Sequence, residues 1–410
     1  MRLLRGANFR RFWLGQTISL FGDQVTLLAL PLTAVLLLDA RAAEMGYLGA
    51  AALMPHLLFS LPVGAWVERV AVRRHLMIAA DVGRMLLLAS IPLAYGVGHV
   101  TFAQLYGVAF ASGTLAVVFD ISSSTIFVAI AKPDDYLEAN SLLNGSRAFS
   151  YVSGPSIGGV LVQVLSAPTA LLADAASFAA SALLLGRMDA PEPPLEERRG
   201  TLRAQIGEGL RFLFGHWFFR PSLAATATLN FFNLAFGALF ILYCTRHLGV
   251  RPGTLGLVLG AGAVGGILGA AVAPRVGRRI GLGPAFLVGQ ILFPLPLVLV
   301  PLAAGSRPVI LAFLFTAEFF SGLGVMILDI NAGSLITALT PHAVRSRATG
   351  AFRFVNYGIR PLGSLAGGGL GAAVGLRPAL WITTVGALAG VLWLLPSPVL
   401  GIGQLPEAAE

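Results

Sequence analysis

The sequence predicts an all-α polytopic membrane protein in which twelve transmembrane helices form two pseudo-symmetric six-helix bundles. Three observations support this fold class. Of the 410 residues, 56% are hydrophobic and 11% are charged, whereas soluble domains carry about 25% charged residues. The apolar residues fall into long runs, and each is long enough to cross roughly 30 Å of hydrocarbon. Landmarks of the first half also recur between 206 and 210 residues later in the second half.

The apolar runs divide the chain into elements and domains. We expect helices at about 12–38, 45–66, 75–97, 101–130, 142–165 and 169–187, and then at about 219–245, 253–274, 283–304, 308–339, 348–374 and 377–396. Residues 1–187 form the first bundle, 219–398 the second, and 399–410 a C-terminal tail. The long polar segment 188–218 is a cytoplasmic linker, in which RAQIGEGLRFLF is typical of an amphipathic surface helix.

The basic residues predict the orientation of the chain. If both termini are cytoplasmic, 19 of the 28 Lys and Arg residues lie on the cytoplasmic side and five on the outer side. This bias is the usual topology signal of membrane proteins. The basic residues are not gathered in one segment, so the net charge of +9 does not indicate nucleic-acid binding. The single cysteine, Cys244, excludes an internal disulfide, and we expect no metal and no cofactor.

A proline and glycine motif lies in the fifth apolar run. It is formed by Gly154, Pro155, Gly158 and Gly159. The small residues let another helix backbone approach closely, and the proline bends the helix. A similar segment in the second half places Arg353 and Pro361 206 residues after Arg147 and Pro155. Parallel repeats of this kind build one class of secondary transporter.

The connector after the second run carries a further motif. It consists of Gly64, Glu68, Arg69, Arg73 and Arg74. With this connector, the chain resembles the major facilitator superfamily along nearly its whole length. The Gly154–Gly159 element is similar to the motif of that family's drug and metabolite exporters. The segments 9–32 and 118–142 are similar to a bacterial branch that includes the enterobactin exporter and macrolide efflux proteins. The departures are that Glu68 replaces the usual Asp, Ala71 replaces the usual Gly, and the arginine pair lies one residue late. The run at 101–130 also lacks the Arg of the family's motif there, a residue associated with proton coupling.

The resemblance implies a function. We expect a secondary active transporter, not an enzyme, that exports a hydrophobic or amphiphilic small molecule, such as a drug-like natural product or siderophore, in exchange for protons. It implies a monomer among the lipids of the bacterial plasma or inner membrane, with the connector acting as a cytoplasmic gate loop. An importer on the same fold, and a lipid scramblase or uniporter without proton coupling, remain alternatives.

Ionisable residues within the apolar runs are candidate functional sites, because a charge at membrane depth is costly unless it is paired or hydrated. Asp23 and Glu318 are our candidates for proton coupling or substrate binding. The alternative for Asp23 is a packing hydrogen bond against the 348–374 region, and for Glu318 a purely structural role.

The other intramembrane charges suggest pairs. We expect Asp120 to pair with Arg147, and Asp329 with Arg353 in the repeat, either to hold helices together or to act directly on substrate or protons. Asp81 and Arg84 lie one turn apart and are expected to form an intrahelical pair. We expect Asp174 to begin its helix, where a carboxylate suits the helix dipole. Arg360, just before Pro361, is a candidate to attract an anionic group.

Overall fold

The computed structural model describes residues 3–67, 69–70, 72–132, 135–189, 207, 211–340 and 345–403, without the side chains of residues 345–347, 349 and 353. Three predicted features therefore lie outside the described residues. These are Glu68, most of the linker 188–218 with its amphipathic helix, and the tail beyond residue 403.

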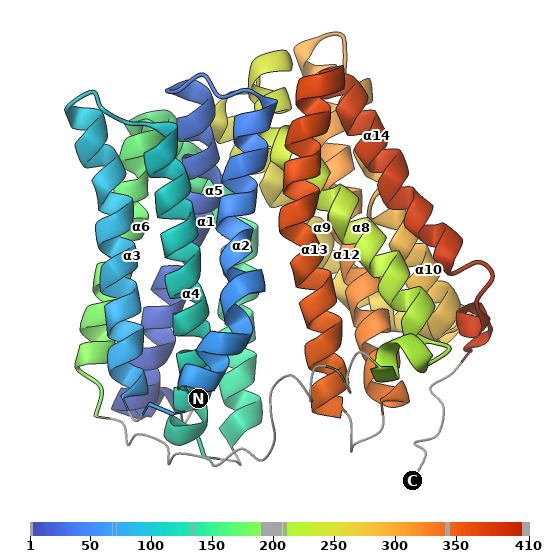
Figure 1. Cartoon of the computed structure of the whole chain (residues 1–410), viewed down its shortest axis with the longest axis horizontal. Coiled ribbons are helices and arrows are strands. Elements are labelled where there is room, and N and C mark those ends of the chain that lie inside the picture. The colour runs from blue at the N-terminus through green and yellow to red at the C-terminus, as the bar shows by residue number, and fades with distance from the viewer. Residues whose placement is uncertain are drawn as a thin grey trace. The chain divides into compact units, whose positions relative to one another are not determined.

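The described residues form long helices joined by short connections (Figure 1). The helices of the first half are α1 (Ala7–Leu36), α2 (Ala42–Val67), α3 (Arg73–Gly96), α4 (Phe102–Ile130), α5 (Tyr136–Leu165) and α6 (Ala167–Gly186). Those of the second half are α8 (Phe219–Leu242), α9 (Pro252–Ile280), α10 (Leu282–Leu292), α11 (Leu299–Leu302), α12 (Arg307–Leu339), α13 (Arg345–Val374) and α14 (Leu376–Ala389). These helices agree with the predicted ones in number and order, if α10 and α11 are taken together.

The composition of these helices matches a lipid environment. In the described part of the chain, eleven segments are long and apolar enough to cross a membrane. The thirty-residue α13, rich in glycine and arginine, is a further long helix. Large apolar side chains face outward, as Leu93 (71% exposed) and Leu137 (82% exposed) illustrate. Exposed apolar surface on this scale is unfavourable in water, and helices that satisfy their own backbone hydrogen bonds suit lipid. The predicted all-α polytopic membrane fold is confirmed.

One predicted helix is interrupted. The sequence predicts a continuous helix over 283–304, but α10 ends at Leu292 and is followed by a 3-10 turn at Leu295–Val298 and the short α11. Pro294, Pro296 and Pro301 fall within this stretch. Each proline removes a backbone donor and clashes with the preceding turn, which explains why the regular helix stops here.

The chain divides into two compact units. Unit 1 contains Met1–Glu44, Ala51–Arg198 and Val250–Gly260, and unit 2 contains Met45–Ala50, Arg199–Gly249 and Ala261–Glu410. In unit 1, α6 packs against both α1 and α3, around a core that includes Phe12, Met77 and Leu185. In unit 2, α8 packs against α13 and α14, and α10 packs against α12.

Candidate functional site

Small residues bring α1 and α6 close together in unit 1. A Cβ atom added to Gly15 would lie 3.2 Å from the Ser181 hydroxyl, and one added to Gly22 would lie 2.8 Å from Cβ of Ser177. Close approach of backbones through small residues is the usual packing of helices in lipid. It also places polar side chains of the two helices within hydrogen-bond reach of each other.

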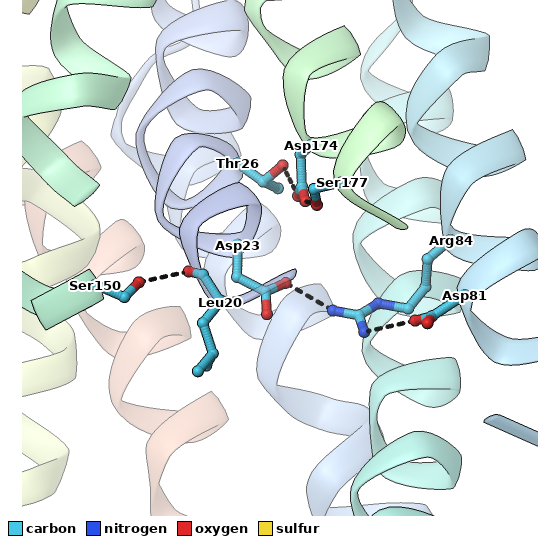
Figure 2. A network of polar contacts seen from close by, with 8 residues as sticks. All are labelled: Leu20, Asp23, Thr26, Asp81, Arg84, Ser150, Asp174 and Ser177. Atoms are coloured by element: carbon cyan, nitrogen blue, oxygen red, sulfur yellow. Dashed lines mark hydrogen bonds and ion pairs between the residues drawn. The ribbon is translucent and has the colours of Figure 1, made fainter. Parts of the chain in front are cut away.

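An ion pair joins α1 to α3 beside this contact. The Arg84 Nη2 atom lies 2.6 Å from Oδ1 of Asp23 (Figure 2). The Arg84 side chain is 9% exposed, and its guanidinium carbon lies 3.8 Å from the centre of the Phe178 ring on α6. The Asp23 side chain is 41% exposed. Asp23 is therefore the accessible member of a pair whose arginine is buried.

A second carboxylate lies on the other side of Arg84. The Oδ1 atom of Asp81, one turn earlier on α3, lies 3.9 Å from Nη1 of Arg84 (Figure 2). Asp81 is fully buried. The charges of Arg84 and Asp23 and the Ser181 hydroxyl act on it, but neither carboxyl oxygen has a hydrogen bond of standard geometry in the described part of the chain. The predicted intrahelical pair is confirmed, and Arg84 has a carboxylate on each side.

The third carboxylate, Asp174, links α6 to α1. It is fully buried, and it accepts hydrogen bonds from the hydroxyls of Thr26 and, at 2.9 Å, Ser177. The prediction that Asp174 begins its helix is wrong, because α6 begins at Ala167. Asp174 is held by side-chain hydroxyls within the helix, not by the helix N-terminus.

We call Asp23, Asp81, Asp174 and Arg84 the α1–α3–α6 cluster. Within unit 1 the partner of Asp23 is Arg84, and the expected alternative, a hydrogen bond against the 348–374 region, stays a prediction. The contacts of Arg84 with Asp23 and of Thr26 with Asp174 are not among those expected from the sequence. A comparison of how far each charged residue lies along its helix would have indicated Arg84 as a partner of Asp23.

The predicted Asp120–Arg147 pair does not form in this structure. Both side chains are exposed, and neither of the two ion pairs found among the described residues, Arg84–Asp23 and Arg84–Asp81, joins Asp120 to Arg147. Asp120 does interact electrostatically with Arg84, Asp23 and Arg147, so it borders the α1–α3–α6 cluster. The side chain of Arg353 lies outside the described residues. The pairing of Asp329 with Arg353 therefore stays a prediction.

The Gly154–Gly159 motif packs α5 against α1 directly beside Asp23. Cβ atoms added to Gly154 and Gly158 would lie 2.5 Å from Cβ of Gln24 and 3.2 Å from Cα of Val25. Pro155 is buried within α5. Nearby, the Ser150 hydroxyl donates a hydrogen bond to the Leu20 carbonyl at 2.7 Å (Figure 2). The motif thus fixes the position of the α1 segment that carries Asp23.

The connector after α2 is anchored within unit 1. Arg73 is buried and its Nε donates to the Val67 carbonyl at 3.3 Å, while Arg74 donates to the carbonyl of Met188, just after α6. Arg69 is exposed, and a Cβ on Gly64 would meet nothing within 4 Å. These contacts hold the connector against α6, and its role as a gate stays a prediction.

Glu318 lies in unit 2, on α12. Its Oε2 would be 3.2 Å from a Cβ added to Gly262 of α9, so the carboxyl group packs against a glycine. Neither ion pair found among the described residues involves Glu318. Glu318 and Asp23 belong to different units, and each is a separate candidate.

Long apolar helices with ionisable residues in their interiors are typical of polytopic membrane proteins that move ions or polar solutes. The chain matches the Major Facilitator Superfamily over residues 12–245 and 223–410, and it belongs to that family. It is 30% identical over 384 residues to a protein of Mycolicibacterium fortuitum named multidrug efflux pump Tap, covering 87% of each chain. It is 28% identical to the protein of the same name from Mycobacterium tuberculosis, over 87% of this chain and 85% of that one.

Solved structures show the same fold. The nucleoside transporter NupG superposes with a TM-score of 0.72 at 13% identity, over 95% of this chain and 98% of that chain. A bacterial homologue of the iron transporter ferroportin, in an inward-facing state, gives a TM-score of 0.76 at 16% identity, over 96% and 98%. At these identities the likeness concerns the fold alone.

Proposed function

We propose that this chain is a proton-coupled exporter of hydrophobic or amphiphilic small molecules, such as drug-like natural products or siderophores. Two findings support the proposal. Relatives aligned over most of their length are named multidrug efflux pumps, and unit 1 holds a buried cluster of carboxylates around one arginine. The observation that carries the proposal is the position of Arg84 between Asp23 and Asp81.

The charge of the α1–α3–α6 cluster favours bound protons. Fully ionised, it has three carboxylates against one guanidinium, a net charge of −2. Two uncompensated charges in a dehydrated site cost at least several kcal/mol. Protons on one or two of the carboxyl groups remove this cost. The cluster is therefore suited to take up and release protons.

The geometry suggests how a proton changes the structure. When Asp23 is ionised, its pair with Arg84 ties α1 to α3. A proton on Asp23 removes this attraction, and Arg84 then has Asp81, on its own helix, as the remaining nearby carboxylate. The proton thus replaces a contact between helices by a contact within one helix. A two-state contact of this kind is what couples a local charge change to a conformational change.

Accessibility assigns separate roles to the carboxylates. Asp23 is 41% exposed, so we assign it the exchange of protons with solvent. The fully buried Asp81 and Asp174 hold Arg84 and α1 in place. Glu318, which packs against Gly262 in unit 2, is a second carboxylate for protons or a cationic substrate. We further propose a monomer among the lipids of the bacterial inner membrane, with both termini cytoplasmic.

The test is substrate-induced proton release from the purified protein in weakly buffered detergent. The probes are rhodamine 6G, erythromycin and a catecholate siderophore. Each is added to the wild type and to the Asp23→Asn, Glu318→Gln and Asp189→Asn variants. Asp189 is an exposed carboxylate after α6 and serves as the matched control. We expect release from the wild type and the control, and its loss in Asp23→Asn with binding retained.

Other outcomes would point elsewhere. Binding without proton release in any of the proteins would contradict proton coupling and favour a uniporter or a lipid scramblase. Release that stays intact in Asp23→Asn but is lost in Glu318→Gln would move the coupling site to unit 2. Uptake in place of efflux by cells would indicate an importer on the same fold.

A further inference from the structure

A second polar cluster lies in the interior of unit 2, between α8 and α13. The Nε atom of Arg360 donates a hydrogen bond to Oδ1 of Asn230 at 3.2 Å, and Nδ2 of Asn230 donates to Oδ1 of Asn356 at 3.2 Å. The Arg360 guanidinium carbon lies 4.1 Å from the centre of the Tyr357 ring. Asn230 and Arg360 both lie near the middle of their helices. This arrangement places a charged group deep in the membrane-spanning part of the chain.

The cluster is built by close helix packing. A Cβ added to Gly363 would lie 3.0 Å from the Phe231 carbonyl carbon, and one added to Gly367 would lie 2.6 Å from Cα of Ala235. These glycines follow Arg360 by one and two turns and let α13 approach α8. The approach brings the Asn230 amide within reach of the guanidinium. The orientation of Arg360 is therefore fixed by the backbone packing of two helices.

Most of the hydrogen-bonding capacity of Arg360 is unused. A guanidinium has five N–H donors, and the one on Nε is taken by Asn230. In the described part of the chain, no acceptor engages Nη1 or Nη2, and no carboxylate lies within ion-pair distance. Asp329 of α12 interacts with Arg360 only at longer range. A permanent positive charge at membrane depth is costly unless it is paired or hydrated, and an anionic ligand on the unused donors would compensate the charge of Arg360.

The free donors have the geometry of a carboxylate site. The guanidinium lies over the Tyr357 ring and Asn230 takes the Nε donor, so the N–H groups of Nη1 and Nη2 remain available in the guanidinium plane. Two parallel N–H donors match the two oxygens of a carboxylate. The neighbouring side chains of Tyr357 and Phe354 are 44% and 37% exposed. They offer aromatic surface to the apolar part of the same molecule.

We propose that Arg360, positioned by Asn230 and Tyr357, binds the carboxylate of an anionic or zwitterionic amphiphile that the protein transports. This inference rests on the proposed function, because it names the chemical group that the exporter recognises. It adds a selectivity that neither the family nor the relatives' names specify. The site lies wholly within unit 2 and is separate from the α1–α3–α6 cluster.

The test compares two fluorescent probes that differ in one group. 11-(Dansylamino)undecanoic acid carries the carboxylate, and its primary amide replaces that group with a neutral one. Binding of each to the full-length protein in neutral detergent is followed by dansyl fluorescence. We expect the acid to bind the wild type roughly tenfold or more tightly than the amide, the usual size of a charge-assisted contact.

The variants separate the guanidinium from the fold. Arg360→Gln should abolish the preference for the acid and leave amide binding unchanged, and the retained amide binding shows that the protein is folded. Arg360→Lys should keep part of the preference, because it keeps the charge but loses the two-donor fork. Asn230→Ala should weaken acid binding only. Arg220→Gln, at the exposed start of α8, is the control and should change neither affinity.

Three results would overturn the proposal. The first is equal affinity of the wild type for acid and amide. The second is a loss of both affinities in Arg360→Gln while that variant stays monodisperse and as thermally stable as the wild type. The third is displacement of the acid by stoichiometric phosphatidylglycerol, which would assign the site to a lipid headgroup. Proton release by rhodamine 6G is measured in parallel, so a failure of proton coupling is distinguished from a failure of this subsite.

Discussion

Arg84 is the residue whose removal should disturb unit 1 most. Arg84→Gln leaves Asp23, Asp81 and Asp174 without a nearby positive charge and also removes the contact with Phe178. Removing one partner of a buried ion pair costs about 3–5 kcal/mol. Because Asp23 is 41% exposed, its share is reduced by solvent screening. We therefore expect a loss of about 3 kcal/mol, most of it from the fully buried Asp81.

A double-mutant cycle measures this effect. The unfolding of purified protein in detergent at about pH 8 is compared for Arg84→Gln, Asp81→Asn and the double variant. If Arg84 compensates the charge of Asp81, Asp81→Asn should restore at least about 1 kcal/mol in the Arg84→Gln background, within the usual range for residues in contact. Arg84→Lys should lose only about 1 kcal/mol with the ring contact. Additive effects of the two substitutions would refute the reasoning.

Two further predictions concern packing and pH. Gly22→Ala should destabilise the protein by about 1–3 kcal/mol, because the added Cβ would lie 2.8 Å from Cβ of Ser177. Gly107→Ala is the control and should not destabilise it, because a Cβ there would meet nothing within 4 Å. Thermal unfolding of the two variants measures the difference. Burial lowers the pKa of His216 from 6.5, and its Nδ1 accepts the Phe218 N–H at 3.2 Å. Its contribution to stability is therefore complete above pH 6.5 and lost as the pH falls through the folded-state pKa. The unfolding midpoint should drop more on acidification in the wild type than in His216→Gln, and equal drops would contradict this assignment.

The fold could be predicted almost completely from the sequence, because apolar runs of transmembrane length leave a helix as the natural way to satisfy the backbone in lipid. The break between α10 and α11 was missed although Pro294, Pro296 and Pro301 mark it. A hydropathy value is averaged over many residues, so it does not reveal single prolines, each of which lacks a backbone N–H donor and can break a helix. The prediction therefore places the membrane-spanning segment correctly but wrongly expects one uninterrupted helix.

The candidate site could be predicted only in part. Asp23 was identified because a carboxylate in an apolar run is conspicuous, but hydropathy does not say which helices are neighbours. At 1.5 Å per residue, Asp23 lies about 24 Å along α1 and Arg84 about 17 Å along α3 from the same end of unit 1. The long arginine side chain spans this difference. The distances along the helices thus limit which charged residues can pair with Asp23. The packing of α6 against both α1 and α3 then places Arg84 within reach.

The role of Asp174 depended on a helix boundary. The sequence predicts a helix that begins at about residue 169, two residues later than α6 does, with Asp174 as a partner of the helix dipole. In α6, which begins at Ala167, the carboxylate lies about two turns into the helix and accepts hydrogen bonds from two hydroxyls. Such contacts depend on the rotation of one helix against another, which the sequence does not encode locally.

The measurement that tests proton coupling most directly is efflux from proteoliposomes with an imposed pH gradient. Vesicles containing the wild type or Asp23→Asn are loaded with the amphiphilic dye rhodamine 6G, and release is followed with and without the gradient. We predict that the gradient accelerates release several-fold through the wild type and not through Asp23→Asn, while both proteins bind the dye. Release through the wild type that ignores the gradient, or acceleration that persists in Asp23→Asn, would contradict the account.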